Sequence, residues 1–482
     1  MPKGIQDMSQ NPLARRRRGW LPGVITAGAL VAVAACSAAK ENLLTAVDPD
    51  LIDPTSVQST EGANAIRIGA LSRFRDATAG SDGQWLFGGL LADEWSTSST
   101  FVQNDEADER QISANNSTIV GTYRNYARVR TAANQAIGLL NKYSPSPASN
   151  LAEMYFIRAF VEMQMAQDFC NGIVLSDGAQ DPPVPGLPVT DSVVFARAIA
   201  SYDSALALST ATDAFTVSIR NAATVGKARA LMGINQQAQA ATLVAAIPTT
   251  FTYDLTFSTT SGDNILWNQP NSSQRYTVSD SLEGNGRNLL VTGQVPFFSA
   301  KDPRLPVSYT IASNGKDTVK SQDGLTFSRR TTLWARTSNV PVVNGIDARM
   351  IEAEAKAKGG DIAGAMTILN AIRTAPPAKL GEVALTATSL PALNAPATTA
   401  ATVDLVFRER AFWTFSRGQR LGDLRRLMRQ YGRSEAQTFP TGSHYRGGSY
   451  GHDVNFPVVT DENNNPNLVT LGTKSACLDR NP

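Results

Sequence analysis

The side chains that could perform acid–base or metal chemistry are few and poorly placed for it. The 482-residue chain has two histidines, His444 and His452, and no third zinc ligand stands near them. Adjacent carboxylates at Asp93–Glu94 and Asp105–Glu106 would serve a glycosidase only across a cleft. Neighbours on a helix point apart, so we interpret these pairs as solvated acids. No phosphate-binding or nucleophile motif occurs, and we predict no catalytic residue, metal or cofactor.

Ligand binding is better supported by the residue types of the polar segments. Sugars stack an apolar face on aromatic rings and pair their hydroxyls with Asn, Asp and Arg. The best single candidate is Trp267, within the stretch NILWNQPNSSQRY. The predicted ligand-binding residues are Trp267, Asn264, Asn268, Arg275, Tyr276, Trp95 and Trp85. An aromatic ring packed on the core explains each tryptophan equally well when it is taken alone.

A segment from Val403 to Arg433 combines eight arginines with large apolar residues. Helical spacing turns the apolar residues inward and leaves the arginines on the rim. Gly418 weakens a helix by about 1 kcal/mol relative to alanine, so we expect two helices joined near residues 417–419.

The same arginines could form a stripe that binds nucleic acid. The formal net charge of the whole chain is only +2, and the chain stays near neutral without its basic N-terminus. We therefore predict no nucleic-acid partner. Arg410 and Arg420 are expected to form ion pairs, with Glu409 and Asp423 as nearby acids.

The N-terminus has the pattern of an export signal. Four arginines at 15–18 precede an uncharged run from Trp20 to Ala35, which is shorter than the roughly 20 residues of a membrane-spanning helix. The run ends in small residues before Cys36, which resembles a lipoprotein signal-peptidase site. We expect residues 1–35 to be removed and fatty acyl chains such as palmitate on Cys36 to anchor the protein. An ordinary secretory signal with a coincidental cysteine is the alternative.

Two further cysteines, Cys170 and Cys477, are far apart in the sequence. An exported chain with two cysteines favours a disulfide, which would fasten the C-terminal tail to the end of a helix. Two unpaired buried cysteines are the alternative.

Helical patterns predict a mostly α fold. Pairs of helices with small residues at their crossings resemble tetratricopeptide-like helical hairpins, separated by long irregular loops and a few short β-hairpins. The expected helices cover 62–78, 85–95, 119–140, 151–170, 194–208, 222–232, 236–247, 347–358 and 362–373. Asp361 is expected to cap the last of these helices. Residues 96–117 and 171–192 are predicted to be loops.

Composition divides the chain into five parts. These are a lipoprotein signal peptide (1–35), a lipid-anchored tether (36–60), a helical-repeat part (61–247), an irregular ligand-binding part (248–340) and a C-terminal helical part with a tail (341–482). Long loops between repeat helices are where function is usually found.

An ordered set of motifs carries a family resemblance. In order along the chain they are Cys36, the tether at 48–54, Asp302–Leu305, the pair Ile351–Ala355 and Leu369–Arg373, the spaced residues Glu409, Arg410, Gly418, Arg420, Asp423, Leu424, Arg425 and Arg426, and finally Phe456–Pro457. The set resembles the SusD/RagB-type surface lipoproteins. Trp413, Arg417 and Val459 depart from the family pattern.

The resemblance implies a non-enzymatic protein on the outer face of the cell outer membrane. Such a protein captures a glycan or other oligomeric nutrient. It passes the ligand to a partner TonB-dependent (SusC-like) transporter and acts as the lid of that transporter. A surface glycoside hydrolase and a purely structural helical-repeat scaffold are the alternatives.

Overall fold

The computed structural model describes residues 57–80, 83–180, 182–281, 295–470, 472 and 476–482, which form one compact unit. The expected signal peptide, Cys36 and all but the last residues of the expected tether lie outside the described residues. The predictions made for them stay predictions.

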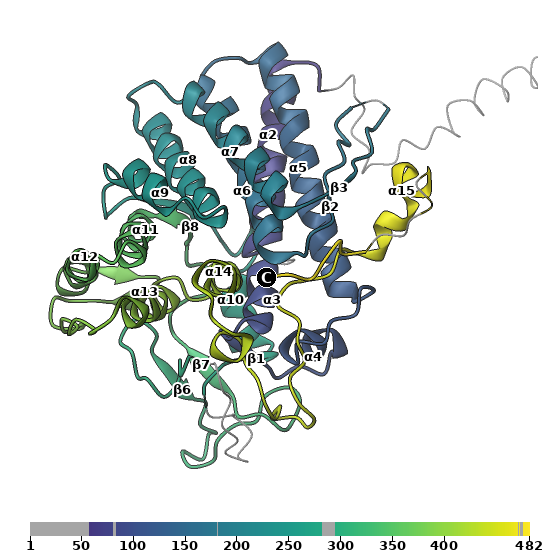
Figure 1. Cartoon of the computed structure of the whole chain (residues 1–482). Coiled ribbons are helices and arrows are strands. Elements are labelled where there is room, and N and C mark those ends of the chain that lie inside the picture. The colour runs from purple at the N-terminus through teal and green to yellow at the C-terminus, as the bar shows by residue number, and fades with distance from the viewer. Residues whose placement is uncertain (1–56, 81–82, 181, 282–294, 471, 473–475) are drawn as a thin grey trace, which may run out of the picture. The chain divides into compact units, whose positions relative to one another are not determined.

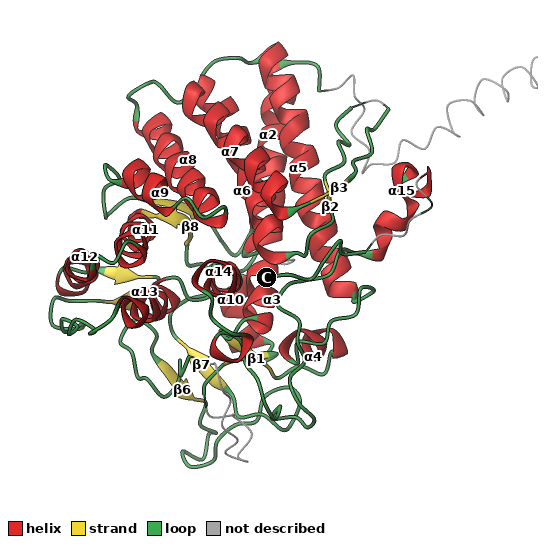
Figure 2. Ribbon diagram, in the orientation of Figure 1, coloured by secondary structure: helices red, strands yellow, loops and turns green. Residues whose placement is uncertain are grey.

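The described chain is mostly helical, which confirms the predicted fold class. Its α-helices are α2 (Thr60–Thr78), α3 (Gln84–Leu91), α4 (Val102–Asp108), α5 (Ser117–Tyr143), α6 (Ala148–Asp168), α7 (Asp191–Leu208), α8 (Ala214–Gly233), α9 (Gln237–Val244), α10 (Ile265–Trp267), α11 (Gly345–Lys358), α12 (Ile362–Thr374), α13 (Thr399–Trp413), α14 (Arg420–Tyr431) and α15 (Pro466–Thr470). Figure 2 shows how little strand accompanies them.

The strands form small antiparallel pairs. They are β1 (Trp95–Thr97) with β5 (Tyr276–Val278), β2 (Ile173–Val174) with β3 (Pro188–Val189), β4 (Thr252–Leu255) with β8 (Val340–Asn344), β6 (Val307–Tyr309) with β7 (Arg329–Thr331), and β9 (Lys379–Leu380) with β10 (Val383–Ala384). Most of the β residues therefore come from the expected irregular part and its borders.

The helices α2, α5, α6, α7 and α8 stand side by side, with α6 in contact with α5, α7 and α8 (Figure 1). Nearly every residue of α6 is buried. Small residues allow the close crossings, because a Cβ on Gly226 would lie 2.5 Å from the Tyr202 ring. A Cβ on Gly233 would likewise lie 2.5 Å from the Phe195 ring. These glycines bring α7 and α8 together.

The C-terminal helices form a second group. Helix α11 packs against α9, α12 and α13, and Asp361 caps α12 by accepting a hydrogen bond from Gly364 N, as the sequence predicted. The tail returns to the end of α6, where Cys170 and Cys477 form a disulfide with their Cα atoms 5.6 Å apart. This is the pairing expected from the sequence.

The predicted start of the helix at 222–232 is wrong, since α8 begins at Ala214. Two further assignments are also wrong. Helix α3 ends at Leu91, and Trp95 lies in strand β1, because β1 pairs with the distant β5 and so ends the helical run early. The expected loop 96–117 contains α4. Tertiary pairing outweighs local pattern in both places. No helix among the described residues has the length and apolar character of a membrane span.

Candidate functional site

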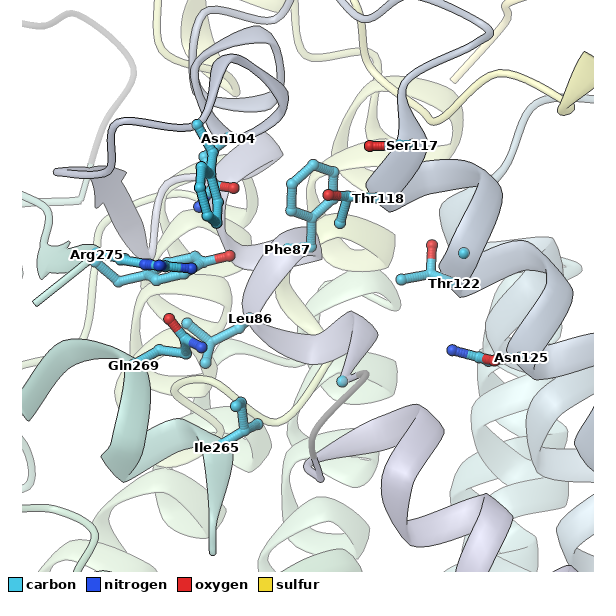
Figure 3. Close-up of a pocket in the computed structure, with 14 residues that line it drawn as sticks. Leu86, Phe87, Asn104, Ser117, Thr118, Thr122, Asn125, Ile265, Gln269 and Arg275 are labelled. Atoms are coloured by element: carbon cyan, nitrogen blue, oxygen red, sulfur yellow. The ribbon is translucent and has the colours of Figure 1, made fainter. Parts of the chain in front are cut away.

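A cavity of about 280 Å³ opens beside the first turns of α5, and we name it the α5 cavity. Figure 3 shows Ser117, Thr118, Thr122 and Asn125 on one side, Ile265, Gln269 and Arg275 on the other, and Leu86 and Phe87 between them. Gly83, Phe101, Asn104, Gly121 and Tyr276 complete the lining. The volume is at the lower end of the range of about 300–1,000 Å³ that is usual for ligand sites.

The lining combines aromatic rings with uncharged polar groups. Phe101 is 45% exposed, and Tyr276 is buried with its hydroxyl bonded to the Asn104 side chain. Burial raises the pKa of Tyr276, so the hydroxyl stays protonated and can donate. Rings, hydroxyls and amides are the groups that carbohydrate recognition uses.

The wall from Ile265 to Tyr276 has two unusual backbone features. A π-helical turn at Asn268–Ser272 carries Gln269; such turns are rare and frequent at functional sites. Gln274 has a φ of 56°, a left-handed conformation that is uncommon and costly for a residue other than glycine. The Gln274 carbonyl accepts hydrogen bonds from Ser98 Oγ and Gln322 N, which hold this conformation.

Two polar atoms from the cavity-lining residues of this wall lack partners. Gln269 Oε1 and Arg275 Nε are buried from solvent and have no hydrogen-bond partner in the described part of the chain. Buried polar atoms without partners cost free energy. Since both side chains line the cavity, a ligand that pairs with them would recover that free energy.

The structure brings together only some of the predicted ligand residues. Arg275 and Tyr276 line the α5 cavity. Trp267 and Asn268 lie on the same segment, half-buried and outside the lining. Asn264 is fully buried and caps α10 by accepting a hydrogen bond from Leu266 N. Its role here is structural.

The predictions for Trp85 and Trp95 are wrong. Trp85 is 0% exposed and packs against Phe160 at 6.3 Å between ring centroids. Trp95 is 1% exposed, packs on Phe415 at 5.1 Å and donates from Nε1 to Ser416 Oγ. Neither ring presents a face to a ligand, so the alternative of core packing is correct for both.

Sequence reasoning missed most of the other wall. Phe101, Asn104 and Ser117 lie in the segment 96–117 that is expected to be a loop, and Thr118 lies directly before the expected helix 119–140. A signal was available in Phe101, an isolated aromatic residue in a polar stretch.

The interpretation of Asp93 and Glu94 as solvated acids is wrong, since each is 1% exposed. Asp93 accepts two hydrogen bonds from Arg420 at 2.6 and 2.8 Å. Glu94 accepts one from Ser416 N at 2.7 Å. Burial outweighs that hydrogen bond and raises the pKa of Glu94 to about 8. Both acids belong to the core and cannot act on a ligand in the cavity.

The histidines lie apart from the cavity. His444 is buried with Nε2 3.3 Å from Asp108 Oδ2, whereas His452 is exposed. No group of three or more potential metal ligands occurs among the residues that the structure describes.

Comparison with known proteins identifies the architecture. No family model and no curated sequence matches the chain. A SusD-like protein from Bacteroides fragilis superposes with a TM-score of 0.58 at 15% identity, over 85% of this chain and 96% of its own. The fold is SusD-like. A SusD/RagB family protein from Bacteroides thetaiotaomicron gives a TM-score of 0.57 at 12% identity, over 84% and 95% of the two chains.

A third SusD-like neighbour is described as a carbohydrate-binding protein. It comes from Bacteroides vulgatus and gives a TM-score of 0.52 at 14% identity, over 76% of this chain and 83% of its own. At such identities the likeness concerns the fold alone.

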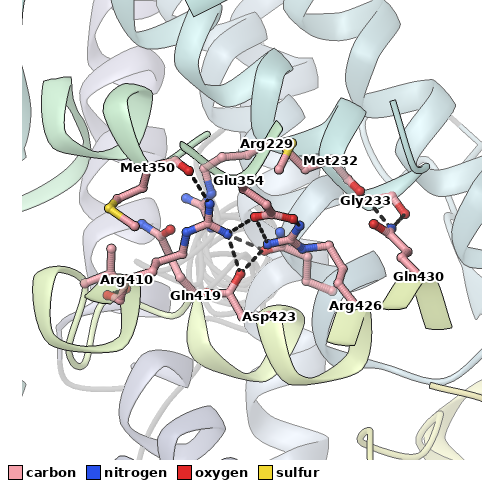
Figure 4. A network of polar contacts seen from close by, with 12 residues as sticks. Arg229, Met232, Gly233, Met350, Glu354, Arg410, Gln419, Asp423, Arg426 and Gln430 are labelled. Carbon is pink, nitrogen blue, oxygen red and sulfur yellow. Dashed lines mark hydrogen bonds and ion pairs between the residues drawn. The ribbon is translucent and has the colours of Figure 1, made fainter. Parts of the chain in front are cut away.

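In this SusD-like fold, the motif residues meet in buried ion pairs. Glu354 accepts hydrogen bonds from Arg410, Arg426 and the Tyr431 hydroxyl. Asp423 accepts from Arg426 at 2.6 Å and from Arg410 at 3.2 Å. Figure 4 shows Glu354 between the two guanidinium groups, and we call these five residues the Glu354 cluster.

The prediction that the arginines lie on the rim is therefore wrong for five of the eight, whereas Arg408 and Arg429 are exposed and Arg433 is half-buried. Arg410, Arg417, Arg420, Arg425 and Arg426 are all at most 5% exposed. The helix break at Gly418 is confirmed, with a φ of 64°. Glycine is sterically required at position 418, because a Cβ there would lie 2.2 Å from Trp85 Cδ1.

The expected ion pairs form, but of the two expected acids only Asp423 takes part. Arg410 binds Glu354 and Asp423 rather than Glu409, and Arg420 binds Asp93. Glu409 instead accepts from Arg304 at 2.7 Å and Arg373 at 2.9 Å. Adjacent helical residues point apart, so Glu409 and Arg410 serve different networks.

Proposed function

We propose that this protein binds a glycan in the α5 cavity. The observation that carries the proposal is the lining itself. The cavity is lined by exposed and buried aromatic rings together with hydroxyl and amide groups. Gln269 Oε1 and Arg275 Nε have no hydrogen-bond partner in the described part of the chain. The cavity would hold a small part of a longer ligand, with the remainder in solvent.

The residues that line the cavity support binding of the glycan without its hydrolysis. A glycosidase needs two carboxyl groups flanking the scissile bond, and the described lining residues include none. The neighbour from Bacteroides vulgatus described as carbohydrate-binding supports the same assignment.

The test replaces a glycine of the lining by a larger residue whose side chain fills the cavity. Gly121 lines the cavity in α5, and a Cβ there would meet nothing within 4 Å. Gly138 lies on the same helix outside the lining, with equally open space. We expect Gly121→Leu to weaken glycan binding at least tenfold, measured on a glycan array and then by calorimetry with the best glycan. Gly138→Leu is the matched control.

Two results would contradict the proposal. One is the absence of binding to any glycan, as the alternative of a structural scaffold requires. The other is equal binding by the two leucine variants, which would place the glycan elsewhere.

We further propose that the protein is a lipoprotein anchored through Cys36 on the surface of the outer membrane. There it would deliver its ligand to a SusC-like TonB-dependent transporter by opening and closing as a lid. The support is the signal pattern before Cys36, together with the SusD-like fold.

Two experiments test this placement. Cys36→Ala should release the protein from membranes, and unchanged membrane association would contradict the anchor. The wild-type protein should co-purify with a TonB-dependent transporter from detergent extracts, and its isolation alone under mild conditions would contradict the partnership.

A further inference from the structure

Arg275 is the one charged residue among the described residues that line the α5 cavity. Its guanidinium carbon lies 4.0 Å from the centroid of the Phe101 ring. No described carboxylate lies within ion-pair distance of it, and its Nε has no hydrogen-bond partner. Arg275 is half-buried, so solvent screens only part of its charge and an opposite charge on a ligand can balance the rest.

The acids nearest this wall are already engaged. Asp105 binds Arg446 and accepts from Thr97 Oγ1. Glu106 accepts from Ser113 N at 3.2 Å and from Asn116 Nδ2 at 2.8 Å. Asp108, the third acid of α4, accepts from Thr97 N at 2.9 Å and from the Tyr445 hydroxyl at 2.8 Å. Each described carboxylate of α4 therefore has partners other than Arg275.

A further acid, Asp263, lies just before this wall in the sequence. Asp263 accepts from Arg336 at 2.7 Å and from Asn268 Nδ2 at 3.3 Å. It is not among the residues that line the cavity.

The backbone holds Arg275 in place without such a partner. Arg275 N donates to Gln269 O, and Arg275 O accepts from Ser98 N, both at 3.0 Å. The left-handed Gln274 directly before it sets the direction in which the chain enters β5. A charge fixed in advance binds an opposite charge at low entropic cost. The arrangement is therefore that of a receptor for an anion.

We infer that the glycan bound in the α5 cavity is acidic and that its carboxylate or sulfate pairs with Arg275. This inference rests on the proposed glycan binding and adds the class of sugar. The acidic group would lie against the guanidinium beside the Phe101 ring. The sugar hydroxyls would face Gln269 on the same wall and Thr118, Thr122 and Asn125 opposite.

Guanidinium chemistry makes both acid types suitable. The N–H groups of a guanidinium match the paired oxygens of a carboxylate, and charge-assisted hydrogen bonds are about twice as strong as neutral ones. The first probe is an oligogalacturonate compared with its methyl ester, which keeps the chain and removes the charge. A sulfated galactan oligosaccharide and its desulfated form test the other source of the anion.

The experiment measures affinity by calorimetry for wild-type protein, Arg275→Gln and Arg275→Lys. We expect at least one acidic probe to bind at least tenfold more tightly than its neutral form. Arg275→Gln should remove that preference, and Arg275→Lys should retain part of it. Arg330→Gln is the matched control, because Arg330 is half-buried on β7, outside the lining, with no described carboxylate in ion-pair distance. Added salt should weaken only the acidic probes.

The outcomes separate this inference from the proposed function. If each acidic probe and its neutral form bind wild type equally, and Gly121→Leu blocks both, the inference would be overturned and glycan binding would stand. Absence of all glycan binding would overturn both. Acidic probes that lose affinity equally in Arg275→Gln and Arg330→Gln would also overturn it, since the effect would then be one of overall charge.

Discussion

The α13–α14 region and the α5 cavity use arginine in opposite ways. In the first, Arg410 and Arg426 are buried against Glu354 and Asp423. In the second, Arg275 is half-buried beside Phe101 with no described carboxylate to balance it. The chemistry of the side chain is the same, and only the surroundings differ.

The difference separates residues that hold the fold from a residue that serves a ligand. A buried charge without its partner is strongly unfavourable, so each arginine of the Glu354 cluster depends on its acids. Arg275 can lose its charge at little cost to stability, because no described partner depends on it. The predictions below test this distinction, beginning with the largest expected effect.

The largest effect is expected from Glu354→Gln. The substitution leaves Arg410 and Arg426 buried without their shared carboxylate, and removal of one partner from a buried pair costs roughly 3–5 kcal/mol. Urea unfolding monitored by circular dichroism measures the loss. Glu352→Gln is the control, because Glu352 is half-buried and pairs with Arg349 on the same helix. Equal losses in both variants would contradict a special role for the cluster.

The same residue predicts a loss of stability in acid. Burial alone would raise the pKa of Glu354, but Arg410 and Arg426 outweigh burial and lower the pKa to about 2. Its stabilising contribution is therefore complete above the unfolded value near 4.5 and is lost as the pH falls toward 2. Wild-type stability should fall across this window, and Glu354→Gln should flatten the fall.

A smaller effect is expected when glutamine replaces single arginines. Arg417 donates to both oxygens of Asp347, at 3.1 and 2.8 Å, so Arg417→Gln should cost about 3 kcal/mol. Arg275→Gln should change stability by no more than about 0.5 kcal/mol. Denaturant midpoints of the two variants give the comparison. A large loss for Arg275→Gln would mean that Arg275 is structural after all.

Glu94 provides a test of opposite sign. Its folded-state pKa of about 8 lies above the ordinary value of 4.5, so the folded state holds the proton more tightly. Its contribution to stability is then complete below pH 4.5 and declines as the pH rises toward 8. Glu94→Gln should remove that decline in a series of unfolding curves. An unchanged pH profile would show that Glu94 is already ionised in the fold.

The smallest effect is expected from Gly121→Ala. A Cβ at this position meets nothing within 4 Å, and alanine favours a helix over glycine by up to about 1 kcal/mol. The variant should be slightly more stable in thermal unfolding and should still bind glycan, unlike Gly121→Leu. A loss of stability would mean that the cavity wall has no room for a side chain.

Much of the helical scaffold could be predicted, because local sequence patterns determine where these helices form. Helices α5, α6, α7, α11 and α12 follow apolar spacing along the sequence, and Asp361 caps its helix as expected. Gly418 marked a helix break by its residue type alone, since an interior glycine weakens a helix. The ordered motifs likewise indicate a SusD-like architecture from the sequence alone.

The burial of charge could not be predicted from local pattern. Amphipathic spacing placed the arginines of residues 403–433 on the rim, where charged residues normally lie. In the structure, carboxylates more than fifty residues away neutralise them, such as Glu354 for Arg410 and Asp93 for Arg420. Such pairing depends on which helices meet.

The sequence by itself determined a mostly helical fold and a break at Gly418, and it pointed to the segment that contains Arg275 and Tyr276 as a candidate for ligand binding. Only the tertiary structure decided that Trp85 and Trp95 are core residues and that α3, α4 and α5 complete the lining of the cavity. The physical reason is that periodicity reports which residues avoid water. A cavity instead requires side chains from four separate segments to face one another.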